Sequence, residues 1–113
     1  MDPLTLSRII YNLILDKKPL DIEIIDVRPV SSLADFLIIT TSGSKIQTKA
    51  IITHITGSLK KSKIKTLNIE GYPGLNWILM DYSNLVVHIF SKEAKKYYQF
   101  NRLWEDCNKI TFD

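Results

Sequence analysis

The strongest constraint in this sequence is a pair of β-rich runs, Asn76 to Tyr82 and Leu85 to Phe90, separated by only two residues. A connection of two residues is the length of a tight β-hairpin. If Ser83 and Asn84 form that turn, the residues opposite each other on the two strands follow by counting, and opposed residues share one face of the sheet. The pattern therefore predicts both faces of the hairpin.

The two predicted faces differ in composition. One face is apolar or aromatic throughout and is expected to lie in the core: Ile78, Met80, Tyr82, Leu85, Val87 and Ile89. The other, called the mixed face here, combines large aromatic residues with a carboxylate and an imidazole: Trp77, Leu79, Asp81, Val86, His88 and Phe90. Such a mixture is typical of a half-exposed contact surface, so the mixed face is the candidate binding surface.

The remaining patterns predict one α/β domain. Its 113 residues are enough for a single hydrophobic core. Apolar periodicity and capping signals predict helices over about 4–16, 44–61 and 92–104, and β-branched runs predict strands over 22–27, 36–41 and 64–70 beside the hairpin. We therefore expect a mixed sheet of about five strands flanked by helices over residues 1–104, followed by a short tail, 105–113, that frays.

Composition narrows the class of protein. Hydrophobic residues make up 45% of the chain and charged residues 24%, as in folded globular domains. Apolar runs such as Phe36 to Ile39 are far shorter than the roughly 20 residues of a membrane helix. The start, Met1-Asp2-Pro3, lacks the layout of a secretory signal, and the single Cys107 fits a reducing compartment. These features predict a cytoplasmic protein without a membrane partner.

Motifs for catalysis are absent from the sequence. It has no GxGxxG, Walker loop, HExxH or paired Cys and His cluster, and no Asp-x-Asp pair to hold magnesium. We expect no enzyme activity, cofactor or metal. His54 is expected to be an ordinary surface or boundary residue. For His88 two possibilities stay open: a structural histidine whose hydrogen bonds are satisfied within the sheet, or a ring that a nearby side chain such as Asp81 orients. Ser42-Gly43-Ser44 ahead of a helix could contact a phosphate, but also fits an ordinary serine cap.

The distribution of charge predicts a basic edge. The net charge is +3, yet no acid occurs between Asp35 and Glu70. Six lysines fall in that interval: Lys45, Lys49, Lys60, Lys61, Lys63 and Lys65. They are expected to form a solvated helix end and strand edge, with direct RNA binding as the alternative.

The order and spacing of several motifs resemble those of the ribosomal silencing factor (RsfS), or Iojap, family over about residues 4–104. The motifs are Asp26-Val27, Ser31 to Thr41, Glu70-Gly71, Trp77 to Tyr82, Val86 to Phe90, Tyr97-Tyr98 and Leu103-Trp104. The resemblance implies a small, non-enzymatic α/β protein with a nucleotidyltransferase-like sheet. It also implies binding to large-subunit ribosomal protein fourteen, steric blocking of subunit association with repression of translation, and homodimers away from the ribosome.

The resemblance also implies which residues bind the partner. The family pattern falls on Asp35, Glu70, Trp77, Asp81, His88, Tyr98 and Trp104. To these we add Leu79, from the mixed face, and Leu103, beside Trp104. Trp77, Asp81 and His88 belong to the mixed face predicted from the hairpin alone, so the two arguments select one surface. No direct reading of nucleic-acid sequence is expected.

The sequence departs from the family pattern at several positions. Ser42 replaces the usual Gly, Ile46 an Arg, Ser83-Asn84 a Gly-Asp turn, and Phe100-Asn101 a Leu-Glu pair. Asn84, which tolerates positive φ, is expected to carry the turn. The alternative function is a nucleotide-binding or residual nucleotidyltransferase domain that uses Asp35 and residues 42–44.

Overall fold

The computed structural model describes residues 2–71, 74–98 and 105–112, without the side chains of Tyr97 and Tyr98. In chain order the elements are α1 (Pro3–Leu15), β1 (Asp21–Asp26), β2 (Phe36–Ser42), α2 (Lys45–Lys61), β3 (Asn68–Glu70), β4 (Trp77–Asp81), β5 (Leu85–Ser91), α3 (Lys92–Tyr98) and β6 (Asn108–Ile110). The six strands found there form one sheet in the order β3-β4-β5-β2-β1-β6. Because β2 and β5 are parallel and the other pairs antiparallel, the predicted mixed α/β fold is confirmed.

The hairpin has the predicted register. Trp77 pairs with Phe90, Leu79 with His88 and Asp81 with Val86. The prediction for the turn is wrong, because Ser83 rather than Asn84 has the positive φ, at 72°. A positive φ at the first central residue is a feature of type II′ turns, and the Ser83 amide donates a hydrogen bond of 2.8 Å to Asp81 Oδ1.

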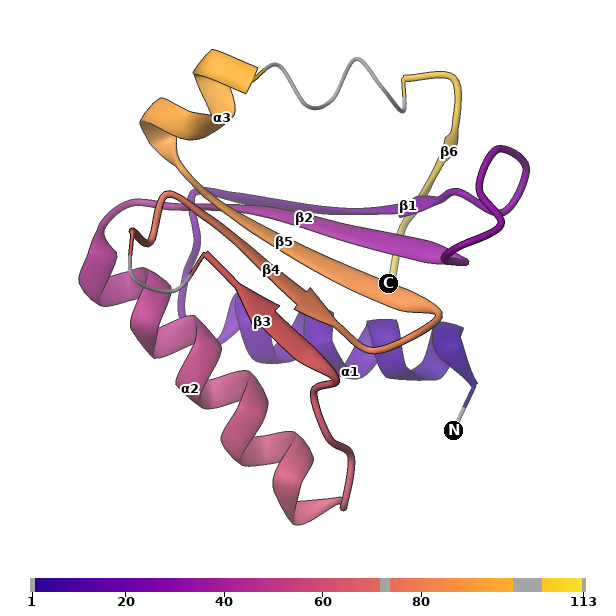
Figure 1. Ribbon diagram of the computed structural model, residues 1–113, viewed down its shortest axis with the longest axis horizontal. Helices are drawn as coiled ribbons and strands as arrows, with labels where there is room; N and C mark the ends of the chain where they lie inside the picture. The colour runs from indigo at the N-terminus through magenta and orange to yellow at the C-terminus, as the bar shows by residue number, and fades with distance from the viewer. Residues whose placement is uncertain (1, 72–73, 99–104, 113) are drawn as a thin grey trace.

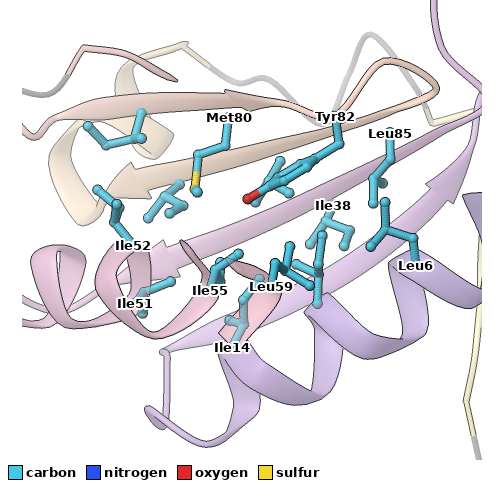
Figure 2. Close-up of a cluster of buried hydrophobic side chains, with 14 of the residues drawn as sticks. Leu6, Ile14, Ile38, Ile51, Ile52, Ile55, Leu59, Met80, Tyr82 and Leu85 are labelled. Atoms are coloured by element: carbon cyan, nitrogen blue, oxygen red, sulfur yellow. The ribbon is translucent and has the colours of Figure 1, made fainter. Parts of the chain in front are cut away.

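The predicted core face of the hairpin lies in the main hydrophobic core. Helices α1 and α2 both pack on one side of the sheet (Figure 1). Figure 2 shows side chains from both helices meeting Ile38, Met80, Tyr82 and Leu85 of the sheet. All six predicted core residues of the hairpin are buried. Alternation along two strands was therefore sufficient to identify the core side.

The third predicted strand is shorter than expected, since only Asn68–Glu70 of the predicted 64–70 is strand. The residues before it complete a C-terminal cap on α2. Lys63 has a φ of 61°, its amide donates to the Lys60 carbonyl, and the Ile64 amide donates to the Leu59 carbonyl. This is a Schellman motif, and Ile64 packs against the same core as Leu59. A glycine usually occupies the position of Lys63, so the sequence did not reveal the motif.

The expectation that the C-terminal tail frays is also wrong. Residues 108–110 form β6, which pairs antiparallel with β1 and makes the sheet six-stranded rather than five-stranded. Beyond it, the Phe112 ring lies 5.5 Å from the Tyr11 ring, and the Arg8 guanidinium lies over Phe112. These contacts hold the end of the chain against α1. The predicted extension of the last helix over 99–104 lies outside the described residues.

Candidate partner-binding face

The mixed face lies on the side of the sheet opposite α1 and α2, where α3 packs (Figure 1). It is less exposed than the sequence predicted. Phe90 is fully buried in a second apolar cluster with Ala94 of α3, and His88 is 6% exposed. Trp77, Leu79, Asp81 and Val86 are half-buried. The accessible part of the mixed face therefore lies mainly on β4, which is next to the edge strand β3.

Three rings on the mixed face form a stacked group. The Trp77 and Phe90 rings have centroids 5.0 Å apart at 29°, and the His88 and Phe90 rings lie 6.2 Å apart at 14°. Trp77 Nε1 donates a hydrogen bond of 3.0 Å to His88 Nδ1. The indole is therefore held in one orientation while part of it stays exposed, as expected for a preorganised binding anchor.

The hydrogen bond to Trp77 also defines the state of His88. Since Nδ1 accepts the hydrogen bond from the indole N–H, the neutral ring carries its own proton on Nε2. Burial lowers the pKa of His88 to about 4 from an ordinary value of 6.5, because the charged imidazolium loses its hydration. Of the two possibilities for His88, the structure supports a histidine that is hydrogen-bonded within the sheet. Its partner there is Trp77 and not Asp81.

This pKa predicts how stability depends on pH. The folded pKa lies below the unfolded value, so between about pH 6.5 and 4 the unfolded chain binds a proton that the folded protein excludes. The free energy of unfolding should therefore fall as the pH decreases through that interval. We expect His88→Asn, which keeps an acceptor near Nδ1, to flatten the pH dependence in urea unfolding between pH 7 and 4. An unchanged slope in the variant would exclude His88 as its source.

An acidic residue extends the accessible part of the mixed face towards the edge of the sheet. Glu70 of β3 pairs with Leu79 of β4, so the two side chains share the face, and Glu70 is exposed. Gly71, with a φ of 84°, follows directly, and a Cβ there would overlap the Trp77 carbonyl oxygen. This glycine allows the end of β3 to pass close to the Trp77 backbone. Glu70, Trp77, Leu79 and Asp81, together called the β4 patch, are thus brought to one surface.

The other predicted site residues lie elsewhere. Asp35 precedes β2 and lies outside the mixed face. Its backbone amide donates a hydrogen bond of 2.7 Å to the Asn84 carbonyl oxygen. It lines an open hollow of about 450 Å³ beside the start of α1, together with Asp26 and Arg28. Tyr98 is the last residue of α3, and its side chain is outside the described part of the chain. Leu103 and Trp104 lie outside the described residues altogether.

The residues of the nucleotide-binding alternative are not brought together. Asp35 immediately precedes the seven-residue β2 and Ser42 ends it, so the two residues are about 23 Å apart at roughly 3.3 Å per residue. The Gly43 amide donates to Gln47 Oε1, and the Gln47 amide donates to Ser44 Oγ. The adjoining hollow is lined by both Lys45 and Glu93, whose opposite charges leave no net positive charge to attract a phosphate. This arrangement favours the ordinary serine cap.

His54 occupies a boundary position, as expected. Its Nε2 lies 3.0 Å from Asp16 Oδ2, which joins α2 to the end of α1. Within the described ranges, no group of three or more His, Cys, Asp and Glu residues is placed to hold a metal ion. None of the helices described there is long and apolar enough to cross a membrane.

Comparison with known proteins decides the family. A family model described as "Ribosomal silencing factor during starvation" matches residues 2–113. The chain belongs to the RsfS family. The RsfS protein of Bacillus subtilis is 33% identical over 98 residues, which cover 87% of this chain and 83% of that protein. A crystal structure of a Chromobacterium violaceum protein matches with a TM-score of 0.88 at 28% identity, over 99% of this chain and 92% of that one.

A more distant relative carries a different name. The mouse "Mitochondrial assembly of ribosomal large subunit protein 1" is 24% identical over 98 residues, covering 84% of this chain and 43% of that protein. RsfS membership confirms the resemblance read from the sequence motifs. The family model and the bacterial relatives are named as ribosomal silencing factors, whereas the name of the mouse relative refers to assembly of the large ribosomal subunit.

Proposed function

We propose that the protein binds large-subunit ribosomal protein fourteen through the β4 patch and thereby blocks association of the ribosomal subunits. The observation that carries this proposal is the half-buried Trp77, oriented by His88 and Phe90 and placed on one surface with Glu70 and Asp81. Trp side chains are frequent anchors of protein interfaces. The flanking carboxylates favour a basic partner and fix the register of docking.

The size of the domain is sufficient for steric blocking. Its principal extents are 35 × 34 × 28 Å, and a standard interface needs about 800 Å² from each partner. A body of this size bound to one subunit would prevent close approach of the other, and no reaction is required. A cytoplasmic location and a homodimer away from the ribosome stay predictions from the family resemblance.

Sedimentation tests the proposal directly. Purified protein added to ribosomes should bind free large subunits and shift the profile from joined ribosomes towards separate subunits. Isolated ribosomal protein fourteen should be retained by the immobilised protein, whereas another basic large-subunit protein of similar charge should not. Unchanged profiles at saturating protein, or equal retention of both ribosomal proteins, would contradict the proposal.

A further inference from the structure

The outer side of α2 carries a basic hollow that the β4 patch leaves unexplained. This hollow, of about 580 Å³ and open to solvent, is called the α2 groove. Its lining includes Lys17, Lys49, His54, Gly57 and Lys61. Since α2 and α3 lie on opposite sides of the sheet (Figure 1), the α2 groove faces away from the mixed face.

The lysines of the α2 groove are available for an external anion. Lys17, Lys49 and Lys61 are exposed, and among the described residues none of them forms an ion pair. The sequence holds no acid between Asp35 and Glu70, so α2 itself adds no negative charge. The nearby acid, Asp16, already contacts His54 at 3.0 Å. Within the described residues, the lining of the α2 groove therefore contains three lysines and no carboxylate.

The walls of the α2 groove are held in place by contacts between α2 and the residues that follow α1. Gln47 Nε2 donates to the carbonyl oxygens of Lys17 and Lys18, at 2.9 and 2.7 Å. The contact between His54 and Asp16 joins the same two segments further along. A ligand would thus meet lysines on two segments whose backbones are already held together, so that only the lysine side chains have to be ordered.

The shape of the α2 groove indicates an extended ligand. Lys49, Thr53, Gly57 and Lys61 follow each other at intervals of four residues and all line the α2 groove, in a row that winds gradually around the helix. The two lysines are about 18 Å apart along the helix axis, at roughly 1.5 Å per residue, which is longer than a single phosphate group. A Cβ at Gly57 would meet nothing within 4 Å, so a chain could approach the helix backbone there.

The chemistry of the lining distinguishes between three classes of anionic partner, which are a lipid surface, a protein and a nucleic acid. The residues between the lysines are small or polar, among them Ala50, Thr53 and Ser58. They provide no bulky apolar side chain for insertion into a lipid surface and no aromatic anchor for a protein interface. We propose that the α2 groove binds the phosphate backbone of RNA, without reading its bases, while the β4 patch binds protein. The choice of RNA among nucleic acids rests on the proposed ribosomal function.

Salt titration of RNA binding tests the α2 groove. A 20-nucleotide single-stranded RNA should bind the purified protein at 50 mM salt, and log K should fall linearly with log salt. Each lysine that contacts a phosphate contributes about 0.7 to that slope. K49Q/K61Q should therefore bind about tenfold more weakly at 50 mM salt with a slope shallower by about 1.4, whereas K49R/K61R should bind as the unmodified protein does.

The control is K60Q/K65Q, which removes the same charge from exposed lysines that line a different hollow. It should lose little affinity, and thermal unfolding should show that all variants fold. Absence of RNA binding at 50 mM salt, equal losses in both Gln pairs, or displacement of RNA by equimolar polyglutamate would each overturn the proposal. Binding of isolated ribosomal protein fourteen is measured without RNA, so failure of the α2 groove leaves the β4 patch to be judged separately.

Discussion

Replacing Ile78 or Ile89 by alanine should lower the free energy of unfolding by about 2–5 kcal/mol. The two residues pair with each other across the hairpin, and both are 0% exposed within the core formed with α1 and α2. Truncation removes packed methyl groups and leaves a cavity that rigid neighbours fill only in part. Urea unfolding at neutral pH measures the change.

Partner binding distinguishes a core role from a contact role. Ile78 and Ile89 point away from the β4 patch, so the fraction of either variant that stays folded should bind the large subunit with unchanged affinity. Ile78→Val, which removes a single methylene, is the matched control and should cost about 0.5–1.5 kcal/mol. If Ile78→Ala kept full stability but no longer bound, the two faces of the hairpin would be assigned the wrong way round, because a slip of one residue exchanges them.

Replacing Trp77 by alanine should weaken binding to the large subunit by about 2 kcal/mol or more, roughly thirtyfold in the dissociation constant. The indole is the largest partly exposed group of the β4 patch, and its stacking on Phe90 and its hydrogen bond to His88 fix its orientation. Because the same contacts support the fold, stability should also fall, by about 1–2 kcal/mol. This is less than the loss expected at the fully buried isoleucines.

Trp77→Phe separates the two contributions of this residue. The variant keeps an aromatic ring against Phe90 but removes the N–H that reaches His88, so we expect an affinity between those of Ala and Trp. Affinities are compared per folded molecule, with Lys65→Ala as a surface substitution outside the β4 patch. Native affinity in Trp77→Ala would exclude the indole as an anchor, even if the protein still bound the large subunit.

The candidate site was predicted in part. Sequence alternation put Trp77, Leu79 and Asp81 on one face, and register with β3 adds Glu70 to it. Alternation did not show that α3 covers Phe90. It also did not show which of the two diagonal neighbours of His88, Trp77 or Asp81, forms the hydrogen bond; in the structure it is Trp77. Both diagonal neighbours lie at similar distances in an ideal hairpin, so side-chain packing makes the choice.

The sequence by itself determined the features that depend on neighbours along the chain. Residues alternate between faces at a period of two, and a two-residue turn sets the register, so the core side of the hairpin follows from Ser83-Asn84 and the flanking runs. Only the tertiary structure decided that residues 108–110 join the sheet as β6, that Lys63 completes a Schellman cap, and that Lys17 lines one groove with Lys49 and Lys61. The β6 pairing and the groove join segments distant in sequence, and the cap depends on a positive φ that is rare for lysine. Packing of the whole chain selects all three.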